Sequence, residues 1–256
     1  GMPPTAGIGI GTLALVPAGE WLIRTNGWRD TFRLFGFGTM IVYALATLVV
    51  ARAPTPPPAS TNRSLKAVVT SSSFSQMYVS GLLMSTALFV PFVFIIEYSK
   101  DRGVPEQEAA LLISVIGVGS VLVRLGLGAL GLRFTTARVA FLFFAVQPVG
   151  YGLWLLSDGF YPLLVVFAGI LGVAYGGYVA LSPVLAAEFY GIEGLGSILG
   201  VLYTSAGVGG LIGPIAAGFL LDATGSFTVI IAISIGLTTL ATLVFAPLWS
   251  SPKSGT

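Results

Sequence analysis

Arg124 is the residue of this sequence best suited to bind a ligand, because it lies inside a long apolar run. A guanidinium near the centre of a membrane helix costs about 2.5–3.5 kcal/mol on insertion scales, so it needs an interior partner or a ligand. Its planar fork of N–H donors matches a carboxylate bidentately, which an ammonium group does not. An organic anion is the predicted ligand. The alternative is that Arg124 extends its charge to the nearby membrane interface or acts as a structural anchor.

Small and polar residues share the helical face of Arg124. Ser114, Gly117, Ser120 and Gly128 recur at the spacing that places side chains on one face of a helix. Such a stripe favours contact with neighbouring helices or with a cavity. We therefore predict that Ser120 contributes to substrate binding beside Arg124.

Glu97 is a candidate proton carrier. It closes an apolar run beside Tyr98, and an ionisable residue within a membrane span is a functional candidate by default. The alternative is an interfacial carboxylate that offsets Lys100 and Arg102.

The sequence contains no His and no Cys. It therefore lacks the common zinc ligands, the Ser-His and Cys-His nucleophile pairs and any disulfide. No Gly-Lys-Ser/Thr follows a glycine run, so no ATP-binding loop is predicted. We expect no cofactor and no metal site. A membrane enzyme is also not expected, because no paired carboxylates occur within the apolar runs.

The composition indicates lipid as the solvent. Of the 256 residues, 55% are hydrophobic and 9% are charged, whereas soluble domains carry about 25% charged residues. The mean hydropathy is +0.94. The 12 Lys and Arg residues are scattered between apolar runs, so they form no patch that could follow a phosphate backbone, and nucleic acid is not a predicted partner.

Eight apolar runs are long enough to cross a bilayer, which takes about 20 residues per helix. An all-α, multi-pass membrane protein is therefore predicted. The runs cover approximately Ala6 to Ile23, Phe32 to Ala51, Gln76 to Ile96, Ala109 to Gly131, Val139 to Leu156, Pro162 to Ala187, Gly196 to Leu221 and Phe227 to Leu248.

A proline-rich segment separates the second run from the third, and Pro54, Pro56, Pro57 and Pro58 favour an extended linker there. Basic residues at span ends show a small excess on the side of this linker, which favours a cytoplasmic linker and C-terminus. The six on that side are Arg52, Arg63, Lys66, Arg133, Arg138 and Lys253, and the five on the other are Arg24, Arg29, Arg33, Lys100 and Arg102.

Three stretches carry a family resemblance. They are Gly7-Ile-Gly-Ile-Gly11 with Pro17 and Gly27-Trp-Arg29, then Val90 to Gly103, and then Gly172-Val-Ala-Tyr-Gly-Gly-Tyr178 through to Gly225. In this order they resemble the fifth span with its following loop, the end of the seventh span, and spans ten and eleven of the major facilitator superfamily. The resemblance is to its monocarboxylate-transporter-like and oxalate/formate-antiporter-like members.

The resemblance implies twelve spans in two six-helix bundles, of which this chain would hold the fifth to the twelfth. Residues 1–52 would be the last two helices of the N-terminal bundle, 53–72 a cytoplasmic linker, 73–250 the complete C-terminal bundle and 251–256 a cytoplasmic tail. Preceding N-terminal helices would be needed to complete the fold. A truncated sequence, a degraded gene and a self-sufficient eight-span protein all remain open. The implied location is the plasma or inner membrane.

The resemblance also implies a secondary transporter of small organic anions that works by alternating access. The Arg of the family's eighth span matches Arg124. The resemblance adds two candidate substrate-binding residues, Tyr203 in the eleventh-span motif and Phe94 in the seventh span. A coupled proton is a further expected partner, and symport, antiport and uniport are not distinguished.

Departures from the family pattern narrow the predicted substrate. Ser120 stands where some members have an Asp, Ala206 ends a Tyr-Thr-Ser-Ala stretch where oxalate/formate antiporters have a Lys, and Leu132 replaces the Asp of a cytoplasmic motif. Because Arg124 is left as a single cation, a monocarboxylate is predicted rather than a dianion. The lost carboxylates also motivate an alternative, a non-transporting membrane sensor or scaffold, or an inactive transporter fragment.

Overall fold

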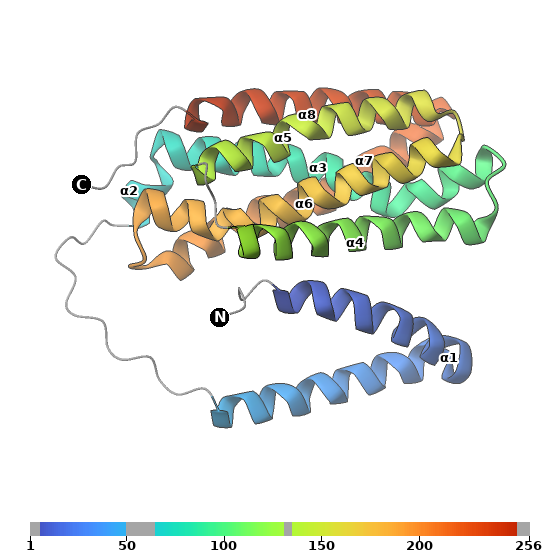
Figure 1. Ribbon diagram of the computed structural model, residues 1–256, viewed down its shortest axis with the longest axis horizontal. Coiled ribbons are helices and arrows are strands. Elements are labelled where there is room, and N and C mark those ends of the chain that lie inside the picture. Colours follow the sequence, from blue (N-terminus) through green and yellow to red (C-terminus); the bar gives the residue numbers. More distant parts are fainter. Residues whose placement is uncertain (1–5, 50–64, 131–134, 250–256) are drawn as a thin grey trace. The chain divides into compact units, whose positions relative to one another are not determined.

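The computed structural model describes residues 6–49, 65–130 and 135–249. All regular structure in these ranges is helical (Figure 1), so the predicted all-α class is confirmed. The helices are α1 (Ala6–Val49), α2 (Leu65–Val69), α3 (Ser72–Asp101), α4 (Glu106–Leu130), α5 (Thr136–Ser157), α6 (Tyr161–Tyr190), α7 (Leu195–Thr224) and α8 (Phe227–Trp249).

The chain divides into two compact units. One unit contains α1 from Gly7 onward, and the other contains α2 to α8. Residues 50–64, which include the prolines of the predicted linker, and residues 250–256, which include the predicted tail, lie outside the described ranges.

Helix α1 combines the first two predicted spans. Its backbone leaves the helical conformation at Gly27, where φ is 77° and ψ is 163°, a region open to glycine because it has no Cβ. The expected turn between the two spans is thus a break at one residue. The second half, Thr25–Leu48, is long and apolar enough to cross a membrane. The first predicted span, residues 6–23, is helical, and its spanning role stays a prediction.

Helix α2 is a short helix that the sequence pattern does not predict. It falls within the expected linker, with Val68 buried and contacts to α3 and α7. It therefore packs on the bundle instead of continuing an extended connection.

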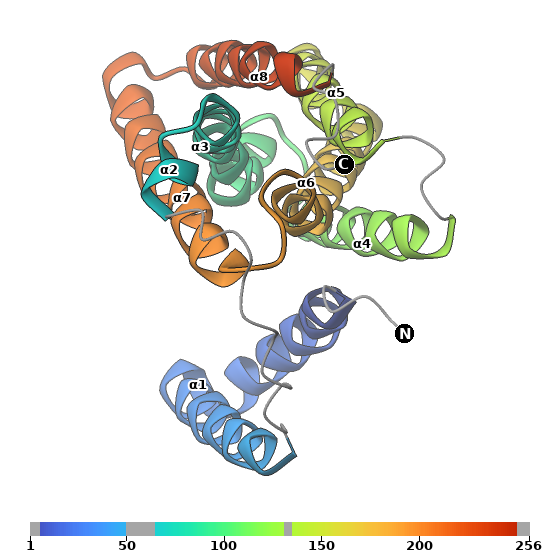
Figure 2. The same ribbon diagram turned by 90° about the vertical axis from the view of Figure 1, so that its left-hand side faces the viewer.

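Helices α3 to α8 form a six-helix bundle (Figure 2). The main pairs are α3 with α7, α4 with α6, α5 with α6, α5 with α8 and α3 with α8. Exchanging α3 with α6, α4 with α7 and α5 with α8 reproduces the same pairs. Because consecutive spans alternate in direction, α3 and α6 run oppositely. The bundle is thus built from two inverted three-helix repeats, an arrangement that recurs in transporters.

Glycines set the closest helix contacts. A Cβ at Gly172 of α6 would overlap the Ile116 carbonyl of α4, and a Cβ at Gly213 of α7 would overlap the Thr86 carbonyl of α3. The exchange of repeats maps one helix pair onto the other, although the glycine lies on α6 in the first contact and on α7, the counterpart of α4, in the second. Close backbone approach without a side chain is how small residues stabilise helix pairs in lipid.

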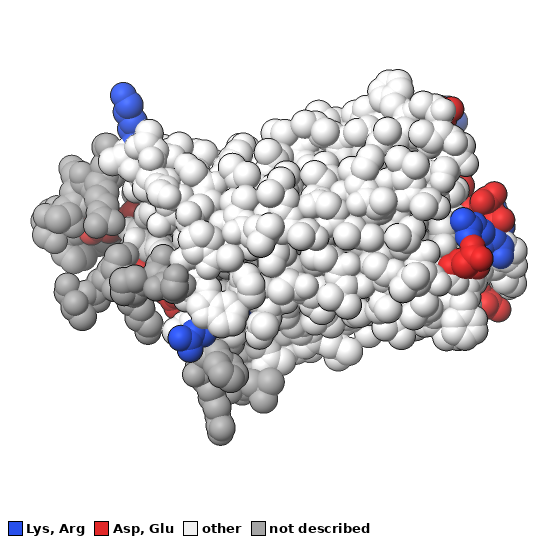
Figure 3. Space-filling model, turned by 90° about the horizontal axis from the view of Figure 1, so that it is seen from above, with Lys and Arg blue, Asp and Glu red and all other residues white. Residues whose placement is uncertain are grey.

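The face of the bundle seen in Figure 3 is uncharged between its two ends. Figure 3 shows Lys, Arg, Asp and Glu gathered at its two ends with uncharged surface between them. Seven helices in the described ranges are long and apolar enough to cross a membrane. The helices also extend beyond the apolar runs, as α3 does in covering residues 72–101 where the predicted run covers 76–96. The extension of α3 carries the charged residues Glu97, Lys100 and Asp101.

Candidate anion-binding site

Arg124 is buried within the bundle, with 3% of its surface exposed. Its guanidinium carbon lies 5.7 Å from the ring centroid of Tyr175, near the middle of α6. Within the described ranges its Nε has no hydrogen-bond partner, and no carboxylate forms an ion pair with it. The face of an aromatic ring attracts a cation but accepts few of its hydrogen bonds. The ring therefore attracts the guanidinium but leaves its Nε–H able to donate a hydrogen bond to a ligand.

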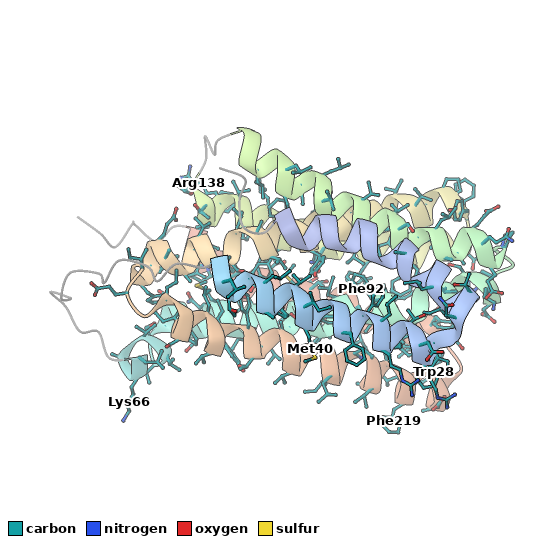
Figure 4. The ribbon with its side chains drawn as sticks, turned by 90° about the horizontal axis from the view of Figure 1, so that it is seen from below. Trp28, Met40, Lys66, Phe92, Arg138 and Phe219 are labelled. Carbon is teal, nitrogen blue, oxygen red and sulfur yellow. The ribbon has the colours of Figure 1, made fainter. Side chains whose placement is uncertain are left out.

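Aromatic rings connect Arg124 to α3. The Tyr175 ring meets the ring of Phe92 edge-on, with centroids 6.1 Å apart, and Phe92 lies 6.2 Å from Phe89. Figure 4 shows Phe92 between the two ends of the bundle, whereas Lys66 and Arg138 lie at one end. An anion bound at Arg124 would therefore have an apolar wall beside it.

Ser120 lies one turn before Arg124, in the contact between α4 and α6. It is buried, and a Cβ placed at Gly176 would lie 2.7 Å from its Oγ. This contact sets the register that places Tyr175 beside Arg124. Ser114, at the start of the predicted stripe, is exposed, so only part of that face is buried within this unit.

Two hydroxyl pairs join α3, α6 and α7. The Tyr203 hydroxyl lies 3.2 Å from Ser182 Oγ, and the Tyr78 hydroxyl lies 3.0 Å from Thr204 Oγ1. Tyr203 is 42% exposed. Its hydroxyl contacts α6, and part of the residue stays exposed.

Phe94 and Glu97 lie apart from the Arg124–Tyr175–Phe92 group. The Phe94 ring approaches Gly218 of α7, with its Cζ 3.8 Å from where a Cβ would be. Glu97 is exposed near the end of α3. Lys100 instead pairs with Glu106, and Arg102 with Asp101 and Asp158, so in the described ranges these bases are offset by other carboxylates.

The sequence and its family resemblance select Tyr203 and Phe94 among the aromatic residues and miss Tyr175 and Phe92, the two rings next to Arg124. The signal that selects Tyr175 is its position directly before Gly176, the glycine that packs on Ser120. The importance of this position is recognised only once the contact between α4 and α6 is known.

The described ranges contain no group of three or more His, Cys, Asp or Glu residues that could hold a metal ion. The donors near Arg124 are instead hydroxyls and one guanidinium. These groups suit binding of an anion by charge and hydrogen bonds.

The family model of the Major Facilitator Superfamily matches residues 77–255, which include α4, α6 and Arg124. The chain belongs to the major facilitator superfamily. This is a family of membrane transporters and not of enzymes. With seven candidate spans in its described ranges, this superfamily member is an integral multi-pass membrane protein.

Several monocarboxylate transporters are similar to this superfamily member. Monocarboxylate transporter 3 of Rattus norvegicus is 33% identical over 239 residues, covering 84% of this chain and 47% of the relative. Monocarboxylate transporter 11 of Homo sapiens is 30% identical, covering 87% and 50%. Monocarboxylate transporter 4 of Mus musculus is 32% identical, covering 86% and 49%. The chain spans about half the length of these relatives.

Proposed function

We propose that this chain is the substrate-binding part of a secondary transporter of small organic anions, above all monocarboxylates. The observation that carries the proposal is the buried guanidinium of Arg124, with an Nε that has no partner in the described ranges. The similarity to monocarboxylate transporters supports it. A carboxylate could accept a hydrogen bond from the unpartnered Nε and a second from an Nη group in a bidentate contact.

The charge distribution supports a substrate with one negative charge. The other basic side chains of the described six-helix unit lie at helix ends: Lys66, Lys100, Arg102 and Arg138. A dianion at Arg124 would leave one carboxylate without a cationic partner in an apolar setting, which is costly. A monocarboxylate with a small apolar body also fits the neighbouring Phe92 and Tyr175 rings.

Transport would proceed by alternating access, with two helical bundles rocking around a site near the midplane. In this proposal α3 to α8 are the C-terminal bundle, α1 is the end of the N-terminal bundle, and residues 53–72 are a cytoplasmic linker. Arg124 binds the carboxylate, Ser120 keeps α4 close to α6, and Tyr203 offers a hydroxyl on α7. Glu97 is the proposed proton carrier. The concentration gradients of the substrate and of any coupled ion would drive transport, without ATP.

The test is uptake of a labelled monocarboxylate panel into vesicles that contain the full-length protein. Arg124→Gln removes the charge at the site and should abolish saturable uptake. Arg138→Gln is the matched control, because it makes the same change at a helix end. Dicarboxylate uptake that persists in Arg124→Gln would refute the monocarboxylate assignment.

A second candidate function is a non-transporting sensor of the same anions. The favouring observation is that no carboxylate pairs with Arg124 in the described ranges, so a charge partner that could relay a proton is missing there. Binding and flux separate the two functions. A sensor would show a ligand-induced rise in melting temperature that Arg124→Gln removes, without uptake or exchange by the wild type.

A further inference from the structure

Within the described ranges, five helices of the bundle contain an internal proline, and in three of them, α3, α5 and α6, a hydroxyl group binds the backbone carbonyl that the proline releases. A proline has no N–H, so the carbonyl four residues earlier loses its helical donor. Pro91 of α3 releases the Ala87 carbonyl, which accepts from the Tyr151 hydroxyl at 2.7 Å. Pro148 of α5 releases the Phe144 carbonyl, which accepts from Thr242 at 3.0 Å.

The third case is local to one helix. Pro183 of α6 releases the Val179 carbonyl, and Ser182 of the same helix donates to it at 3.3 Å. Such replacement donors make proline tolerable in membrane spans, because lipid offers none. At Pro91 and Pro148 the donor comes from another helix, so the bond also ties two helices together at the weak point.

The tie at Pro91 differs from the others because its neighbour along the chain borders Arg124. Phe92 is the next residue, and its ring contacts Tyr175, which in turn lies against the Arg124 guanidinium. Pro148 and Thr242 lie on α5 and α8, and no residue of the Arg124 group comes from those helices. At both prolines a hydroxyl from another helix binds the released carbonyl, but only Pro91 is next to the proposed anion site.

Tyr151 is itself rigidly held. It is fully buried, and its ring packs on Phe167 at 5.5 Å and on Trp154 at 6.0 Å between centroids. Trp154 stacks on Phe167 at 4.9 Å. A buried phenol packed against two aromatic rings has little freedom to turn, so the Ala87 carbonyl cannot move away without losing its donor.

We propose that Tyr151 is a positioning residue for the anion site: its hydroxyl fixes the course of α3 at Pro91 and thereby sets Phe92 against Tyr175 and Arg124. This rests on the proposed function for its transport readout. Beyond the proline, Tyr98 also ties α3 to α5, with its hydroxyl 3.2 Å from Ser157 Oγ. Loss of the Tyr151 hydroxyl alone should therefore weaken the tie to α3 at Pro91 without unfolding the helix.

The first experiment compares Tyr151→Phe with Thr242→Val in the full-length protein. Both remove the donor to a proline-released carbonyl, and both should lower the melting temperature by a few degrees. Only Tyr151→Phe should raise the KM for monocarboxylate uptake, by about three- to tenfold, the loss typical of one hydrogen bond, with Vmax per folded protein nearly unchanged. An unchanged KM in Tyr151→Phe, or an equal rise in Thr242→Val, overturns the proposal.

The second experiment does not depend on transport. In a Pro91→Ala background, residue 91 regains its N–H and donates to the Ala87 carbonyl, so Tyr151→Phe should lower the melting temperature much less than in the wild type. An equal loss in both backgrounds shows that the hydroxyl acts elsewhere and refutes the tie. If wild type takes up no anion while this coupling is present, the proposed function fails and the tie at Pro91 stands.

Discussion

The guanidinium carbon of Arg124 lies 5.7 Å from the centroid of the Tyr175 ring, across the contact between α4 and α6. Cation–π attraction holds the charge without using its N–H donors, because the ring face offers electron density in place of a lone pair. A carboxylate partner would instead occupy those donors. The pairing thus keeps a cation in an apolar bundle and leaves it able to bind an anion.

Replacing Tyr175 separates the ring from its hydroxyl. Tyr175→Leu removes the π face, and since a cation–π contact contributes about 0.5–2 kcal/mol, the KM for uptake should rise about two- to thirtyfold. Tyr175→Phe keeps the face and should change the KM little. Concentration-dependent uptake by both variants measures this. If Tyr175→Phe were as impaired as Tyr175→Leu, the hydroxyl and not the ring would be the important group.

Tyr203 is predicted to contribute its hydroxyl to the substrate. Tyr203→Phe keeps the exposed ring and removes the group that lies 3.2 Å from Ser182 Oγ. We expect the KM to rise by about three- to tenfold, the value of one hydrogen bond. Ser182→Ala is the control, since it breaks the same pair but leaves the tyrosine hydroxyl free. A larger defect in Ser182→Ala than in Tyr203→Phe would assign the pair to packing.

The spans were predictable from the sequence and the contacts between them were not. Apolar runs and charged separators mark each helix of the bundle, because lipid demands continuous apolar length. The neighbour of Arg124 depends instead on how far α6 slides along α4. That register is set where Gly172 meets the Ile116 carbonyl and Gly176 meets Ser120. A GxxxG pattern predicts close packing but does not name its partner.

The break at Gly27 and the helix α2 were missed for a different reason. A polar stretch with Asn and Gly is typical of a loop, yet Gly27 alone absorbs the change of direction by adopting a positive φ. Pro54 to Pro58 favour an extended linker, but they say nothing of residues 65–69, where Val68 gains burial by folding into a helix. At such positions tertiary contacts decide the local structure more strongly than the local composition does.

Gly172→Ala tests the register between α4 and α6. The new Cβ would overlap the Ile116 carbonyl, and because backbone cannot yield as a side chain does, we expect a loss of about 1–3 kcal/mol in stability. Gly169→Ala is the control on the same helix, since its Cβ would have no neighbour within 4 Å and alanine favours helix by about 0.5–1 kcal/mol. Melting temperatures in detergent measure both. Equal tolerance at the two positions contradicts the close contact.

Glu97→Gln tests the proposed proton carrier. If this exposed carboxylate carries the coupled proton, the variant should lose the stimulation of uptake by an inward proton gradient, while exchange of labelled for unlabelled substrate at equal pH continues. Glu106→Gln serves as control, because that carboxylate is exposed and pairs with Lys100 at 3.3 Å. Uptake by Glu97→Gln that still follows the gradient removes Glu97 from the mechanism.

Gly159→Ala tests the turn between α5 and α6 at the end of the bundle opposite α2. Gly159 has φ of 85°, and a Cβ there would lie 2.6 Å from Arg102 Cβ, so alanine meets both backbone strain and a clash. We expect a loss of about 1–2 kcal/mol or more, since a left-handed backbone alone costs that much for a residue with a Cβ.

Asp158→Asn separates this strain from the neighbouring ion pair. Asp158 also adopts a left-handed backbone, with φ of 42°, which asparagine tolerates. The variant therefore removes only the charge that pairs with Arg102, and because the Asp158 side chain is 85% exposed, its loss should cost no more than about 1 kcal/mol. The melting temperature should fall in the order wild type, Asp158→Asn, Gly159→Ala, with the KM for uptake unchanged in both variants. Should Asp158→Asn prove the more damaging of the two, the ion pair would outweigh the glycine in holding this turn.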